Sequence, residues 1–364
     1  MTKLTQAILV TTMLSTVLWA APSYAQMGSA KEGSGEAGRG SPMDGDFKFG
    51  RAKPIAPPKL EAGEESRAAP MADEAKVVES FSILTRTADG KEVRTAPSDA
   101  LKAIIVKELN APEKNPDAGS APQMSIDPAL TEGDEADRQV FGDDDRVQIK
   151  NTKVYPFTAI GYIEGKTKQG YGSCSGTLIG PHTVLTAAHC VYNHDDKAFL
   201  DEIIFVPGLN GPDDAPFGAY AAESVHIVEG YVTNYQGYYG SVLPWDLGVI
   251  NLAEPVGDSL GWLGYANYDD LGDFDANIVG YPGDKPGGTM WRATCTVLAE
   301  NIGDGYFQYD CDTYPGSSGS SVYAYDSRSK QRIVTGVNVA ESPDANTAVR
   351  LNATYVEWIN SVYK

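Results

Sequence analysis

Three short segments of the chain carry residue types that together can cleave an acyl bond. In chain order they hold His189, Asp246 and Ser318, each beside small or apolar residues. A serine hydroxyl becomes a nucleophile when a nearby imidazole takes its proton, and a carboxylate can hold that imidazole in the required tautomer. The three segments therefore predict nucleophilic catalysis through an acyl-enzyme, if the fold brings them together.

The histidine segment reads Leu-Thr-Ala-Ala-His-Cys at residues 185–190. Its apolar start predicts a strand, and a disulfide at Cys190 would fix the backbone that carries the imidazole. The chain has four histidines, and the other three lack this context (His182, His194 and His226). We therefore expect His189 to be the general base.

The aspartate segment reads Asp-Leu-Gly-Val-Ile-Asn-Leu and begins at Asp246. A carboxylate at the start of a buried strand needs a partner, and an imidazole N–H is a suitable one. Residues 140–364 contain 20 aspartates, so an ordinary aspartate at a strand start is the competing interpretation of this segment taken alone.

The serine segment reads Pro-Gly-Ser-Ser-Gly-Ser-Ser at residues 315–321. A nucleophilic serine needs a tight turn whose backbone N–H groups point at the developing oxyanion. Gly316 permits the unusual backbone angles of such a turn and supplies one N–H group, and Ser318 supplies the other. This argument selects Ser318 from the four serines of the segment.

The elements that must position these residues have the pattern of an all-β domain from Val140 onward. Short apolar runs alternate with clusters of Gly, Pro, Asn and Asp, as in a barrel or sandwich. Only the last segment has a clear helical pattern, with Asn352 as its N-cap and Trp358 on its apolar face. Strands are expected at residues 157–160, 176–179, 203–206, 247–250, 277–279 and 333–337.

The chain before Val140 has a different composition. Residues 1–25 read as a secretory signal peptide, with a charged start, a short apolar run and small residues before the cleavage point. Residues 26–139 are rich in Gly, Ala, Pro and charged residues, and we expect a mostly disordered propeptide there. A permanent disordered spacer is the alternative. Arg138 offers a site for a trypsin-like processing enzyme.

Part of this region is expected to have local structure, within residues 76–110. Residues 77–83 alternate partly, like a strand. Ser98 or Asp99 is expected to cap a helix that carries the apolar residues from Leu101 to Leu109.

All four cysteines lie in the C-terminal half of the chain. A secreted chain reaches an oxidising compartment, so two disulfides are expected. Four cysteines allow three pairings. The equal spacing within each sequential pair favours Cys174–Cys190 and Cys295–Cys311, but does not prove it.

The charge of the chain limits its partners. It carries 29 Lys and Arg against 49 Asp and Glu, a net charge of −20. Phosphates would be repelled, so we expect no nucleic acid partner and no membrane binding after signal removal. We expect a monomer, secreted or periplasmic, that acts on protein or peptide substrates.

Taken together, these motifs resemble those of the chymotrypsin-fold serine proteases, most closely the bacterial glutamyl endopeptidases. The resemblance covers residues 140–364, and it extends to the glycine-rich runs at residues 207–211, 280–285 and 288–291. It implies two six-stranded antiparallel β-barrels, a catalytic cleft between them and a C-terminal helix. It also supports the pairing Cys174–Cys190.

The activity implied by the resemblance is that of a secreted serine endopeptidase that prefers Glu before the scissile bond. Ser318 would attack the carbonyl, His189 would relay the proton and Asp246 would orient His189. The amides of Gly316 and Ser318 would stabilise the oxyanion.

The chain departs from this family in the position before the nucleophile and in the specificity pocket. Digestive enzymes of this fold have an aspartate before the serine that pairs with the new N-terminal amine, but Ser317 cannot form that ion pair. Glutamyl endopeptidases place a histidine in the pocket, where this chain has Asn338. The pocket threonine is present as Thr313.

The strand that follows the nucleophile supplies the other expected pocket residues, Val339 and Ala340. Glu341 comes next and would repel a substrate carboxylate if it lay near the pocket. The resemblance therefore implies a weakened preference for Glu, with Gln accepted better than is usual in the family.

No cofactor is expected. Asp195, Asp196 and Asp201 lack the alternating ligands of a calcium loop, so calcium is unsupported and a solvated acidic loop is expected. The alternative function is a non-catalytic secreted binding protein on the same fold, but such relatives usually lose a triad member and none is lost here. An α/β-hydrolase would show the order Ser, Asp, His and alternating helices.

Overall fold

The computed structural model describes residues 26–33, 49–55, 73–111, 124–131, 144–269, 271–342 and 345–364. The predictions for the signal peptide, for Arg138 and for a mature N-terminus at Val140 fall outside the described residues. In the described part of the chain, no helix combines the length and the apolar character that crossing a membrane requires.

The first β-unit is a closed six-stranded barrel. Its strands follow the order β13-β8-β9-β10-β15-β14, and pairing of β13 with β14 closes it. The interior is filled by alternate apolar side chains, including Val184, Phe205 and Ile250. The strands are β8 (Ile160–Thr167), β9 (Gly170–Leu178), β10 (Thr183–Thr186), β13 (Asp201–Pro207), β14 (Tyr220–Val228) and β15 (Gly248–Leu252).

The second β-unit contains six longer strands in the order β19-β18-β21-β22-β23-β20, and four short strands extend it to a ten-stranded open sheet. No pairing within the described chain joins its outer strands. The disulfide Cys295–Cys311 spans that gap, because Cys295 lies in β19 and Cys311 lies two residues after the end of β20. The strands are β18 (Phe274–Gly280), β19 (Trp291–Val297), β20 (Tyr306–Tyr309), β21 (Ser321–Asp326), β22 (Gln331–Glu341) and β23 (Asn346–Arg350).

The predicted all-β class with a C-terminal helix is confirmed, although only the first barrel is closed. Helix α6 (Ala353–Val362) begins at Asn352, whose side chain accepts the N–H of Tyr355 at 2.9 Å. The run at residues 157–160 is mainly a 3₁₀ helix, η2 (Phe157–Ala159), and β8 begins at Ile160. Its apolar character reflects burial rather than extended backbone.

The expected local structure within residues 76–110 is present, but the strand predicted at residues 77–83 is wrong. Asp73 caps helix α1 (Glu74–Ser80), and Val77 and Phe81, four residues apart, are both buried. Strand β4 (Ile83–Thr87) follows. The expected helix is α2 (Asp99–Leu109), capped by Ser98.

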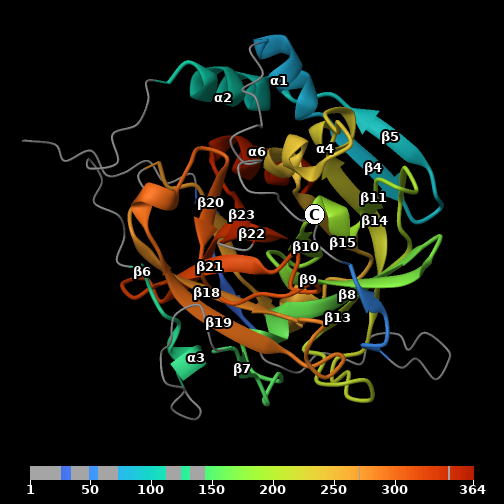
Figure 1. Cartoon of the computed structure of the whole chain (residues 1–364), viewed down its shortest axis with the longest axis vertical. Helices are drawn as coiled ribbons and strands as arrows, with labels where there is room; N and C mark the ends of the chain where they lie inside the picture. The colour runs from blue at the N-terminus through green and yellow to red at the C-terminus, as the bar shows by residue number, and fades with distance from the viewer. Residues whose placement is uncertain are drawn as a thin grey trace, which may run out of the picture.

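These N-terminal elements pack against the barrel. Strand β4 pairs with β14 over five residues and continues in β5 (Glu92–Thr95), so the barrel sheet extends outward. Helices α1 and α2 lie over α6 at one end of the molecule (Figure 1). The Glu108 carboxylate accepts the N–H of Ala353 at the start of α6, at 3.1 Å.

Smaller elements connect these units. Two of the helical turns carry active-site candidates, η3 (Ala188–Cys190) and η4 (Tyr239–Ser241), and η5 (Leu243–Trp245) precedes Asp246. The others are β1 (Gln26–Gly28), β2 (Lys31–Glu32), β3 (Lys53–Pro54), β6 (Met124–Ser125), α3 (Pro128–Thr131), β7 (Val147–Gln148), β11 (Tyr192–Asn193), β12 (Ala198–Phe199), α4 (Gly230–Thr233), α5 (Gly257–Leu260), β16 (Gly261–Trp262), β17 (Gly264–Ala266) and η6 (Ala299–Asn301).

Candidate active site

Two paired strands of the first barrel bring His189 and Asp246 together. The end of β10 is opposite the start of β15, with Thr186 paired to Gly248. His189 follows β10 within η3, and Asp246 precedes β15. Because the two strands are antiparallel, these residues leave the sheet at the same edge.

The carboxylate of Asp246 holds the His189 side chain and backbone at once. Its Oδ2 accepts the N–H of His189 Nδ1 at 2.6 Å, and its Oδ1 accepts the His189 backbone N–H at 2.9 Å. Both side chains are buried, and Asp246 is fully inaccessible to solvent. With Nδ1 as the donor, Nε2 of a neutral imidazole is free to accept a proton.

Tyr239 makes a further contact with this carboxylate that the sequence did not indicate. Its hydroxyl donates to Asp246 Oδ2, the same atom that accepts the His189 side chain. Burial raises the pKa of Tyr239 well above its usual range, so the hydroxyl keeps its proton and remains a donor. The only signal was the position of Tyr239 seven residues before Asp246, in a Tyr- and Gly-rich segment.

The turn of Ser318 lies against the first barrel. The backbone N–H of Ser175 in β9 donates to the Ser318 carbonyl at 2.8 Å. Gly319 has a φ of +82°, and a Cβ there would lie 2.2 Å from Thr186 Oγ1 and 3.2 Å from Ala187 N. Glycine therefore allows the residue after Ser318 to approach the residues just before His189.

The atoms that would react are buried and unpaired. Among the residues that the structure describes, Ser318 Oγ and His189 Nε2 both lack a hydrogen-bond partner, so no hydrogen bond joins the two. Catalytic hydrogen bonds often tighten only when substrate is bound.

The two proposed oxyanion donors are available. Gly316 has a φ of +104°, which favours glycine, and its carbonyl accepts the Ser175 hydroxyl at 2.8 Å. The backbone N–H groups of Gly316 and Ser318 have no acceptor among the described residues. The turn can thus offer two N–H groups to a negatively charged oxygen.

The other three histidines have structural surroundings instead. Burial lowers the pKa of His226 to about 4, and its ring lies between two hydroxyl groups. The His194 ring stacks on Tyr235 with centroids 3.9 Å apart, and His182 bonds a backbone carbonyl. Among the four histidines, His189 is the one whose ring bonds a carboxylate.

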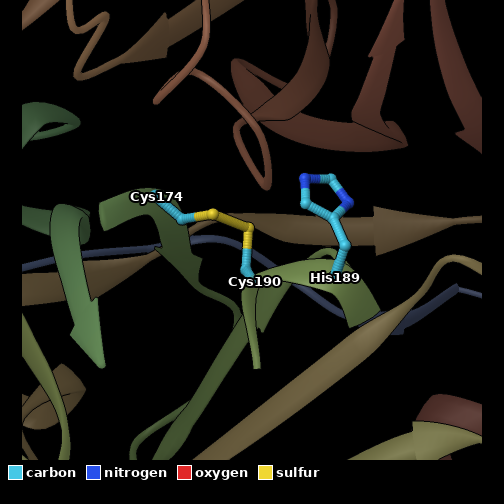
Figure 2. A group of neighbouring side chains, drawn as sticks. All are labelled: Cys174, His189 and Cys190. Carbon is cyan, nitrogen blue, oxygen red and sulfur yellow. A yellow bond between two sulfur atoms is a disulfide. The ribbon is translucent and has the colours of Figure 1, made fainter. Parts of the chain in front are cut away.

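A disulfide lies next to the candidate base. Cys174 in β9 and Cys190 in η3 are joined by an S–S bond of 2.05 Å, beside the His189 ring (Figure 2). Potential ligand atoms of these three residues lie within 4.8 Å of one another. Both sulfurs are engaged in the disulfide and neither is a thiolate, so this group does not fit a metal ion.

The two polar residues expected in the pocket are bonded to other groups of the protein. Asn338 is buried, its Oδ1 accepts the Tyr309 hydroxyl at 2.6 Å, and its Nδ2 donates to the Ser317 carbonyl at 3.2 Å. The Thr313 hydroxyl donates to Glu341 Oε1 at 3.3 Å. Both donors expected to meet a substrate carboxylate thus already have an acceptor within the protein.

Glu341 lies close to the catalytic candidates and is itself perturbed. Burial raises the pKa of its carboxyl to about 7, and nearby Asp284 adds to this rise. The Thr313 hydrogen bond and the nearby Arg146 guanidinium act in the opposite direction. Val339 and Ala340 are fully buried just before it on β22.

Comparison with known proteins finds similarity to peptidases. Residues 174–329 match a family described as "Trypsin-like peptidase domain". A glutamyl endopeptidase of Bacillus licheniformis is 36% identical over 192 residues, which are 52% of this chain and 56% of that protein. A Bacillus subtilis protein named extracellular metalloprotease is 32% identical over 216 residues, 58% of this chain and 66% of that one.

A solved structure of a Glu endopeptidase also matches, with a TM-score of 0.53 and 29% identity, over 62% of this chain and 99% of the other. The chain spans less than two thirds of the length of the two Bacillus relatives. The chymotrypsin-like fold expected from the motifs is confirmed by this structural match. Residues 174–329 therefore resemble trypsin-like peptidase domains, and the chain is similar to bacterial glutamyl endopeptidases.

Proposed function

We propose that the chain is a secreted serine endopeptidase with Ser318 as nucleophile, His189 as general base and Asp246 as the group that orients it. The observation that supports this most is the buried His189–Asp246 pair, at 2.6 Å, beside a turn with an unpaired serine hydroxyl. The glutamyl endopeptidase names of the relatives support the same reaction class.

The proposed reaction proceeds in two halves. Ser318 Oγ attacks the peptide carbonyl carbon while its proton passes to His189 Nε2, and the N–H groups of Gly316 and Ser318 bind the oxyanion. His189 then gives the proton to the leaving amine, which leaves an ester on Ser318. Water attacks that ester by the same steps and restores the hydroxyl. Asp246 stabilises the imidazolium formed in each half.

The proposed specificity is a weakened preference for Glu before the scissile bond. Thr313 and Asn338 each donate to an acceptor within the protein, and Glu341 brings a negative charge close to the site. A substrate Glu carboxylate would meet repulsion once Glu341 is ionised, whereas Gln would not. Residues 26–139 are proposed as a propeptide removed near Val140.

Labelling with a fluorophosphonate tests this function. The secreted chain should form a covalent adduct on the peptide containing Ser318 and should hydrolyse peptides. Ser318→Ala and His189→Ala should lower hydrolysis by several orders of magnitude. Ser320→Ala is a matched control, because Ser320 is also buried with an unpaired hydroxyl. A folded Ser318→Ala protein that keeps substantial activity would favour a binding protein with a contaminating enzyme.

A further inference from the structure

Residues 49–55, far before the peptidase domain in the chain, lie beside the Ser318 turn. Strand β3 (Lys53–Pro54) pairs in parallel with β9 at Gly172 and Ser173. The backbone N–H of Ile55 donates to the Ser173 carbonyl at 2.9 Å. Strand β8 takes the other side of β9 at these residues, so the 49–55 segment occupies an edge that the barrel itself leaves open.

This edge leads directly into the catalytic region. The residue after Ser173 is Cys174, which is bonded to the cysteine next to His189. The following residue, Ser175, bonds the Ser318 carbonyl and the Gly316 carbonyl. A chain paired with β9 here therefore lies close to the nucleophile turn.

Pro54 packs on two glycines at this turn. A Cβ on Gly283 would lie 1.9 Å from Pro54 Cγ, and a Cβ on Gly316 would lie 3.4 Å from Pro54 Cβ. Gly283 donates its N–H to the Pro315 carbonyl, which ties these two glycine loops together. Pro54 thus covers the backbone of the residue that would supply one oxyanion donor.

The same segment continues along the glycine loop on its other side. A Cβ on Gly287 would lie 2.2 Å from the Gly50 carbonyl oxygen, and a Cβ on Gly50 would lie 2.5 Å from Gly288 N. Four glycines after residue 280 therefore lack the side chains that would crowd this segment (Gly283, Gly287, Gly288 and Gly316). Gly50, Pro54 and Ile55 each contact this part of the molecule.

The segment is not held as a substrate would be. A substrate must place its scissile carbonyl oxygen on the N–H groups of Gly316 and Ser318. Neither group donates to a carbonyl of residues 49–55. Extended peptides bind proteins by adding a strand to an open sheet edge, and the 49–55 segment fills such an edge without offering a bond for attack.

We propose that the 49–55 segment is an internal inhibitor that blocks the substrate edge of β9 and the Gly316 turn until it is displaced. This inference rests on the proposed peptidase function. It identifies the open edge of β9 as a peptide-binding surface and the chain's own residues 49–55 as the occupant in the unprocessed protein. The rest of the N-terminal region, packed on β14 and α6, holds the segment at a high local concentration.

The test uses the full secreted chain, confirmed as intact by mass spectrometry. In the double variant Pro54→Asp/Ile55→Asp, the two side chains that pack on Gly316 and Gly172 become charged. The matched control is Arg51→Ala/Lys53→Ala, because these alternate side chains of the same segment are exposed. Each protein is assayed with a peptide that extends several residues beyond the scissile bond and with a small acyl ester.

We expect the double variant to hydrolyse the extended peptide at least tenfold faster than the wild type and the control. A synthetic peptide of residues 49–55 should inhibit the double variant competitively, and the reversed sequence should not. This second measurement does not depend on how the substitutions affect folding of the N-terminal region.

Two different results separate this inference from the proposed function. If the ester is hydrolysed but the extended-peptide rates of all three proteins agree within twofold, or the 49–55 peptide has no effect, the inhibitor role is overturned and the peptidase function stands. If no protein hydrolyses either substrate or reacts with a fluorophosphonate, the peptidase function and the inference that rests on it both fall.

Discussion

Replacing Asp246 by Asn should disable the site through hydrogen-bond direction alone. Asp246 accepts three hydrogen bonds: at Oδ1 from the His189 backbone, and at Oδ2 from the His189 side chain and from Tyr239. Asparagine of the same shape offers one acceptor and one donor. One of the two positions must therefore present N–H to a group that also donates.

Both orientations of the asparagine are unfavourable. With the amide NH₂ toward His189 Nδ1, the imidazole must carry its proton on Nε2, which can then no longer accept the proton of Ser318. With the NH₂ toward the His189 backbone N–H, two donors face each other where a 2.9 Å hydrogen bond existed. Substitutions that force the wrong tautomer in such a triad cost roughly 10⁴-fold in kcat, which corresponds to about 5.4 kcal/mol.

The assay is kcat/KM on a peptide substrate, with thermal unfolding to confirm the fold. Tyr239→Phe is the matched control, since it removes one hydrogen bond to the carboxylate but keeps both bonds to His189. One hydrogen bond to a charged group is worth about 1.5–3 kcal/mol, so its loss should stay near or below about 100-fold. A folded Asp246→Asn protein within tenfold of wild-type activity would refute this reasoning.

Three further predictions concern specificity, stability and maturation. Because burial raises the pKa of Glu341 to about 7, its carboxyl is neutral below that pH and charged above it. The ratio of kcat/KM for Glu peptides to kcat/KM for Gln peptides should therefore fall between about pH 6 and about pH 8, and Glu341→Gln should abolish the fall. A wild-type ratio that does not change with pH would contradict this role of Glu341. Asp127 is fully buried and paired with Arg332, so Asp127→Ala should lower the free energy of unfolding of the full chain by about 3–5 kcal/mol in urea denaturation. The control is Asp258, which forms an exposed ion pair with Lys31, and Asp258→Ala should lower the free energy of unfolding by about 1 kcal/mol or less. Equal losses in the two variants would exclude a special role for burial. The N-terminal sequence of the active form should begin at Gln139 or Val140; a fully active form that begins at residue 26 would contradict a removable propeptide.

The sequence alone determined the features that depend on a few neighbouring residues. Ser98 and Asn352 could be predicted as helix caps because the cap and the N–H groups it bonds lie within three residues. The apolar runs of the barrel strands could be predicted from their bounding turns. The unusual angles of the serine turn also followed from its glycines, and Gly316 indeed has a positive φ.

Prediction from neighbouring residues failed where a short apolar run was compatible with either a buried strand or a buried helix. Residues 77–83 contain Val, Phe and Ile, and their partial alternation suggested a strand. In the structure, the spacing of four between Val77 and Phe81 puts them on one face of α1 and its end, packed against the barrel. A short apolar run fits either backbone, and only the surface it packs on selects between them.

Only the tertiary structure decided how distant groups meet. It joined Asp246 to Tyr239 as well as to His189, and it tied the Asn338 amide to Tyr309. It also placed Pro54 on the glycine turn of the nucleophile, more than 250 positions later in the chain. These contacts link residues with no shared periodicity or motif, because their positions depend on strand pairing and barrel closure rather than on the residues next to them.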